Sequence, residues 1–74
     1  MTAKVDLRGR LVIDAEAAFV IPPSVILSPE QFNKLLRHTD RTVPVYRYRD
    51  KERGTTQLIM FLPGGLTVVT EVKE

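Results

Sequence analysis

The residues best suited to form specific contacts stand in one short run, residues 45–49, in which tyrosines and arginines alternate: Tyr46, Arg47, Tyr48 and Arg49. If this run is a β-strand, successive side chains point to opposite faces, so the two tyrosines share one face and the two arginines the other. Exposed tyrosines can stack on bases or anchor a protein interface, and arginines bind carboxylates and phosphates. The alternative is that both tyrosines pack under a helix and the arginines form a solvated face.

The charges of the chain are unevenly spread. Eleven lysines and arginines against nine aspartates and glutamates give a net charge of only +2 over 74 residues. Residues 33–53, however, carry seven basic side chains and three acidic ones, which concentrates positive potential in the middle of the chain. Such a segment favours a protein partner with an acidic surface. The candidate partner-binding residues are Arg37, Arg41, Tyr46, Arg47, Tyr48 and Arg49.

No group of residues predicts catalysis, a metal site or a cofactor site. His38, the only histidine, falls in the last turn of a predicted helix, where its simplest role is an interaction with the helix dipole. Ser28 is explained as a helix cap, and no serine lies in a nucleophile-elbow pattern. Gly64 and Gly65 lead into a strand, not into the helix N-terminus that a phosphate-binding loop requires. The chain also lacks cysteine, so we expect a non-enzymatic protein without a cofactor, acting in a reducing cytoplasm.

The clearest local structure is a helix over residues 28–38. Ser28 at the N-cap, Pro29 at the first helical position and Gln31 at the third form a capping box. The apolar stripe that follows at i, i+3 and i+4 spacing consists of Phe32, Leu35 and Leu36. A helix of about three turns does not persist alone in water, so it must pack on an apolar surface.

A sheet is the predicted packing partner of this helix. Short turns join residues 43–49, 55–62 and 66–73, which predicts three antiparallel strands. The second strand contains five consecutive apolar residues and should be central and covered on both faces. The third alternates, so one of its faces should be mainly buried and the other mainly wet.

The N-terminal third contains further strand-like segments. Residues 10–13 and 19–21 could pair as a hairpin, and residues 24–27 could resume a strand before the helix. Either this hairpin or residues 66–73 would offer an open sheet edge to a partner strand. The predicted fold is one small α+β domain over residues 1–74, with a mainly antiparallel sheet, the element order β-β-α-β-β-β and one helix packed on one face.

Residues 5–13, Val-Asp-Leu-Arg-Gly-Arg-Leu-Val-Ile, resemble the opening strand of swapped-hairpin, AbrB-like transcription factors. The resemblance implies DNA binding, but it covers only these nine residues. In that family a proline and a short arginine-bearing helix come next, whereas Asp14, Ala15 and Glu16 follow here. The chain is therefore not assigned to the family.

Two functional hypotheses follow. The first is a small regulatory protein that binds a protein partner, of the kind that phages and mobile elements use to regulate or inhibit host transcription machinery. The second is a nucleic-acid-binding module that uses the basic residues 34–53, although a strand-binding platform needs aromatic and basic side chains on one face. The longest uninterrupted apolar run is far shorter than the roughly 20 residues of a membrane span, so no membrane partner is expected. We expect a monomer or a homodimer.

Overall fold

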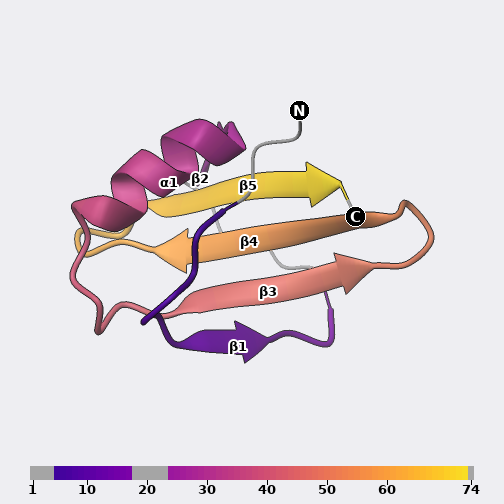
Figure 1. The fold of residues 1–74 in the computed structure, drawn as a ribbon, viewed down its shortest axis with the longest axis horizontal. Helices are drawn as coiled ribbons and strands as arrows, with labels where there is room; N and C mark the ends of the chain where they lie inside the picture. Colours follow the sequence, from indigo (N-terminus) through magenta and orange to yellow (C-terminus); the bar gives the residue numbers. More distant parts are fainter. Residues whose placement is uncertain (1–4, 18–23, 74) are drawn as a thin grey trace.

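The computed structural model describes residues 5–17 and 24–73, which form one helix and a five-stranded sheet (Figure 1). The strands are β1 (Val12–Asp14), β2 (Ser24–Leu27), β3 (Val45–Asp50), β4 (Thr55–Phe61) and β5 (Thr67–Lys73), and the helix is α1 (Pro29–Arg37). The predicted α+β class and the predicted element order are confirmed.

The sheet is mixed, with the order β1-β3-β4-β5-β2. β3, β4 and β5 form the predicted antiparallel meander, whereas β1 pairs in parallel with β3 and β2 pairs in parallel with β5. The predicted N-terminal hairpin joins residues 10–13 to residues 19–21, and the second of these segments lies outside the described residues. β1 and β2 lie at opposite edges of the sheet. The prediction of residues 66–73 as an open edge is wrong. They contribute β5, which lies inside the sheet because β2 covers its outer side.

The helix begins as predicted. Ser28 Oγ accepts a hydrogen bond from Gln31 N at 3.2 Å, and Gln31 Oε1 accepts one from Ser28 N at 3.1 Å. Phe32 is fully buried, which contributes about 1.5–3 kcal/mol and fixes this nine-residue helix on the sheet. Its C-cap, His38, is exposed. Within the described residues, no helix is long and apolar enough to cross a membrane.

One face of the sheet, which we call the helix side, is covered by α1 and by the N-terminal segment, residues 5–7; Figure 1 shows this segment in indigo, crossing the strands beside the helix. The buried side chains here are Phe32, Leu36, Val45, Leu58, Met60 and Val68. We call the other face the opposite side.

The opposite side of the sheet is also partly buried. Ile59 in β4 is fully buried there, so β4 is central and covered on both faces, as predicted. The expectation that one face of β5 would be mainly wet is wrong for Thr67 and Val69, which are 2% and 6% exposed. It holds for Glu71 and Lys73, which are exposed.

The turn between β4 and β5 lies where the glycine pair predicts it. Gly64 and Gly65 both have positive φ, 97° and 92°, a conformation that side chains disfavour. Leu62 N donates to Leu66 O at 2.8 Å and closes the turn. The pair therefore serves chain reversal.

Candidate functional site

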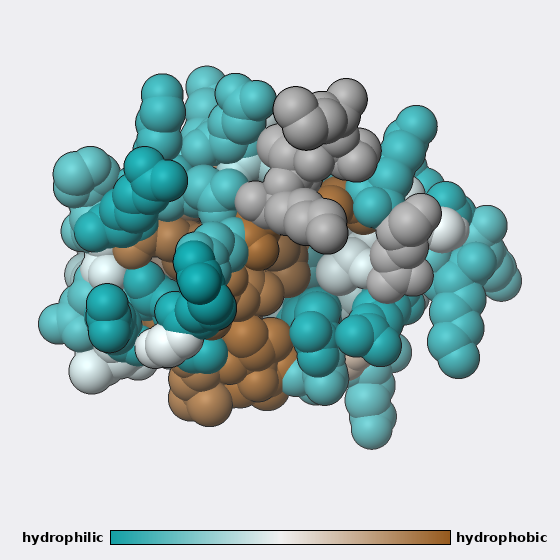
Figure 2. All heavy atoms as spheres, in the orientation of Figure 1, coloured by the Kyte–Doolittle hydropathy of each residue, from teal (hydrophilic) through white to brown (hydrophobic). Residues whose placement is uncertain are grey.

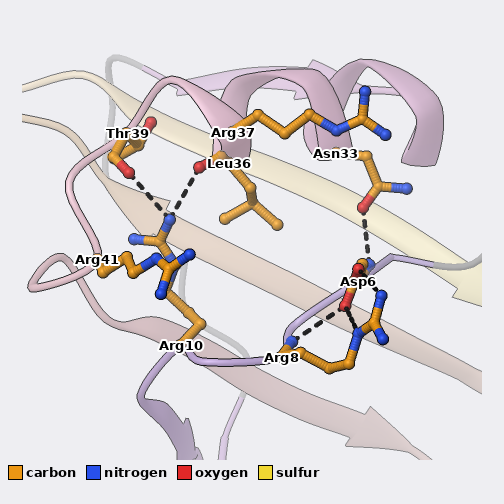
Figure 3. A pocket seen from close by; sticks show the side chains of 8 residues that line it. All are labelled: Asp6, Arg8, Arg10, Asn33, Leu36, Arg37, Thr39 and Arg41. Atoms are coloured by element: carbon orange, nitrogen blue, oxygen red, sulfur yellow. Dashed lines mark hydrogen bonds and ion pairs between the residues drawn. The ribbon is translucent and has the colours of Figure 1, made fainter.

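Four arginines from separate parts of the chain line one cleft on the helix side (Figure 3). The cleft has a volume of about 470 Å³ and lies between the N-terminal segment, α1 and the loop after α1. Its lining residues are Asp6, Arg8, Arg10, Asn33, Leu36, Arg37, Thr39 and Arg41. We call it the arginine cleft. It gathers four guanidinium groups against a single carboxylate.

Arg10 holds the C-terminal end of the helix. Its Nη2 donates to Leu36 O at 2.9 Å and to Thr39 O at 3.1 Å, and its Nη1 donates to Val43 O at 2.8 Å and to Asp40 O. The last carbonyls of a helix lack intrahelical partners and carry partial negative charge, so a guanidinium satisfies both needs. Arg10 is thus a structural residue whose charge still contributes to the potential of the cleft.

Asp6 and Arg8 form an internal ion pair at the rim of the cleft. Arg8 donates to both carboxylate oxygens, from Nε at 3.0 Å and from Nη2 at 2.9 Å. These contacts lower the pKa of Asp6 from 3.8 to about 2, with a smaller contribution from Arg37. Asp6 N donates to Asn33 Oδ1 at 2.7 Å, which ties the N-terminal segment to α1. An acidic group of the chain itself therefore already sits where an external anion would bind.

Arg37 and Arg41 have their guanidinium groups available. Both residues are exposed, and neither makes a hydrogen bond or ion pair within residues 5–17 and 24–73. Arg41 lies against Gly9, where an added Cβ would be 3.6 Å from Arg41 Nη1. Gly9 has a φ of +74° and forms the turn that places Arg8 and Arg10 on either side of it. The two available arginines can receive a carboxylate or a phosphate.

The other two predicted arginines lie in a second hollow on the helix side. This hollow has a volume of about 260 Å³ and is lined by Val5, Leu7, Arg47, Arg49, Thr56, Leu58 and Val72. Arg47 Nε donates to Asp14 Oδ1 at 2.7 Å, and this contact lowers the pKa of Asp14. We call this second hollow the apolar hollow, because aliphatic side chains form most of its lining. In Figure 2, hydrophobic residues reach the surface of this side between hydrophilic ones.

The two predicted tyrosines lie on the opposite side of the sheet. The register pairs Tyr46 with Ile59 and Tyr48 with Gln57, while Arg47 and Arg49 pair with residues of the helix side. The prediction that tyrosines and arginines face opposite ways is confirmed. The alternative that the tyrosines pack under the helix is wrong, since that face holds the arginines. Tyr46 instead packs edge to face on Phe61, with ring centroids 5.4 Å apart.

The predicted site residues are thus divided among three places, and two contributors were missed. Arg37 and Arg41 meet in the arginine cleft, Arg47 and Arg49 meet in the apolar hollow, and the tyrosines are remote from both. Arg8 and Arg10 are the additional arginines. Their signal was a glycine between two arginines, but Arg10 contacts carbonyls 26 to 33 residues away, and sequence spacing does not reveal such a contact.

Metal-binding and family comparisons give no further assignment. Among the described residues, no three histidine, cysteine, aspartate or glutamate side chains are grouped so that they could hold a metal ion. No family model matches the chain, and neither the curated proteins nor the solved structures contain a match. The segment that resembles swapped-hairpin factors forms no strand over residues 5–11, and β1 pairs in parallel with β3. Function is therefore inferred from the clefts alone.

Proposed function

We propose that this chain is a small, non-enzymatic regulatory protein that binds an acidic surface of a protein partner through the arginine cleft. The observation that carries the proposal is the pair of available guanidinium groups of Arg37 and Arg41, beside a third cation, Arg10, that the fold holds in place. Guanidinium groups bind carboxylates with directional, charge-assisted hydrogen bonds. A phage or mobile-element regulator of host transcription machinery, acting in the cytoplasm, is the class of protein that we expect.

The charge distribution favours binding of an acidic partner at the cleft over attraction by the net charge of the whole chain. The net charge of the chain is only +2, so a uniform field would steer partners weakly. Four arginines at one concave site create a local potential that the overall charge does not indicate. At about 150 mM salt, exposed charges more than roughly 8 Å apart are largely screened. Binding that persists under these conditions must come from groups in direct contact with the cleft.

Nucleic acid is the second candidate, because arginines bind phosphates as well as carboxylates. Single-stranded nucleic acid is usually held by basic groups together with aromatic side chains on the same surface. Here the aromatic pair of Tyr46 and Phe61 lies on the opposite side of the sheet from the arginines. Contacts would be limited to a few phosphates, so affinity should be modest and should fall as the salt concentration rises.

The first test is a pulldown from host-cell lysate at about 150 mM salt, with and without nuclease. Three tagged proteins are compared: the wild type, Arg37→Glu/Arg41→Glu and, as a control, Lys51→Glu/Arg53→Glu. Both double variants change the net charge equally, but the control alters the exposed turn between β3 and β4. We expect the wild type and the control to capture a partner protein whether or not the lysate has been treated with nuclease. The Arg37→Glu/Arg41→Glu variant should capture about tenfold less of this protein.

Two results would overturn the proposal. Equal losses in both double variants would show a general charge effect rather than recognition by the cleft. Recovery of nucleic acid alone, or loss of every captured protein after nuclease treatment, would favour the nucleic-acid module.

A further inference from the structure

The arginine cleft and the apolar hollow lie on either side of the N-terminal segment. Successive residues of this segment and of the turn after it line different sites: Asp6 and Arg8 contribute to the arginine cleft, whereas Val5 and Leu7 contribute to the apolar hollow. This is the alternation expected of an extended chain. The two sites are therefore separated by the width of one extended segment, and a single ligand can reach both.

The apolar hollow has the dimensions and lining of a side-chain pocket. Its volume of about 260 Å³ lies below the roughly 300–1,000 Å³ typical of small-molecule sites. Buried Leu58 and partly buried Val72 contribute aliphatic surface from β4 and β5. Arg47 and Arg49 supply positive charge beside this surface. A ligand group that fits must be apolar at its tip and acidic on either side.

We propose that the partner presents an extended acidic segment with one large apolar side chain, which fills the apolar hollow while flanking carboxylates contact the arginines of both sites. This inference rests on the proposed function and specifies its partner. Neighbouring extended segments lie about 5 Å apart, so groups on either side of one segment are about 10 Å apart, which roughly three extended residues span at about 3.3 Å each. The apolar residue and the carboxylate for the arginine cleft should therefore be about two to four residues apart.

Charge complementarity favours an acidic polypeptide over a nucleic acid for this pair of sites. Phosphates could satisfy the guanidinium groups, but a nucleic acid offers no aliphatic side chain for the hollow. An aromatic base would need an aromatic surface, and the described residues that line the hollow include none. A carboxylate-rich segment with one leucine satisfies both sites.

The test uses two synthetic peptides of seven residues, with three aspartates on each side of a central leucine or a central serine. Affinity for the full chain is measured by fluorescence anisotropy at about 50 mM salt, where exposed charges still attract. Full burial of a leucine predicts about tenfold or tighter binding of the leucine peptide. Val72→Lys should remove this difference by filling the hollow and should not weaken binding of the serine peptide. Arg49→Ala should weaken both peptides more than the control Arg53→Ala.

Equal affinity of the two peptides for the wild type would overturn the inference, and this comparison does not depend on any variant folding. Tighter binding of a thymidine decanucleotide than of either peptide would overturn it in favour of nucleic acid. Failure of the inference is distinct from failure of the proposed function. If the serine and leucine peptides bind alike but Arg37→Glu/Arg41→Glu abolishes both, the acidic partner stands and only the apolar anchor is lost.

Discussion

The helix side and the opposite side of the sheet are built from the same strands but carry different chemistry. On the helix side, Arg47 and Arg49 of β3 line the apolar hollow, and four more arginines line the arginine cleft. On the opposite side, Tyr46 and Tyr48 are half-buried, and Tyr46 packs on Phe61. The period-2 alternation of one strand thus assigns charge to one surface and aromatic packing to the other. We infer that binding and stability are divided in the same way between the two faces of β3.

Arg10 sharpens this comparison, because it lines the arginine cleft yet stabilises the fold. Replacing it with methionine keeps the aliphatic stem and removes the guanidinium hydrogen bonds to the carbonyls of Leu36, Thr39 and Val43. We expect the free energy of unfolding to fall by about 2–3 kcal/mol, because these carbonyls lose charge-assisted hydrogen bonds in a partly buried place. Urea denaturation followed by circular dichroism measures the change.

Arg41→Met is the matched control for Arg10→Met. Arg41 lines the same cleft but makes no hydrogen bond or ion pair to any described residue, so its removal should change stability by no more than about 0.5 kcal/mol. Its binding of acidic peptides should weaken. Equal stability losses in the two variants would contradict the structural role of Arg10.

Much of the fold could be predicted because its signals are local. The capping box of Ser28 and Gln31, the apolar run of β4 and the glycine turn after it depend on neighbouring residues. The pairing of β1 and β2 could not be predicted, because a strand-like pattern does not identify the neighbouring strand. Pairing in a hairpin is the simplest expectation, since it requires the shortest connection. Both strands instead pair in parallel with the two outer strands of the meander.

The candidate site was predicted only in part for the same reason. Alternation alone separated the tyrosines from the arginines, and the structure confirms that separation. Local charge density drew attention to Arg37 and Arg41. It could not reveal Arg8 and Arg10, which lie outside the basic segment and reach the cleft only because the N-terminal segment crosses the sheet beside α1.

Two substitutions in β3, one on each face, test whether the two faces serve different roles. Tyr46→Leu removes the edge-to-face contact with Phe61 and should cost about 1 kcal/mol of stability while leaving peptide affinity unchanged. Arg49→Leu should weaken peptide affinity and change stability little, because this residue is exposed and lines the apolar hollow. Thermal denaturation and fluorescence anisotropy on the same samples give both quantities. A loss of affinity in Tyr46→Leu would show that the opposite side takes part in binding.

The smallest expected effect concerns Asp6, the carboxylate that occupies the helix-side binding surface. The Arg8 guanidinium holds its pKa near 2, below the 3.8 of the unfolded chain, so its stabilising contribution is fully present above about pH 4 and is lost as the pH falls through 2. An NMR titration of the Asp6 carboxyl should show this low midpoint, and Arg8→Gln should return it towards 3.8. Asp6→Asn removes the competing internal anion. At neutral pH it should strengthen binding of the acidic peptide by up to about fivefold, the scale of an exposed ion pair. Unchanged or weaker binding would mean that Asp6 holds the arginines in their binding positions rather than competing for them.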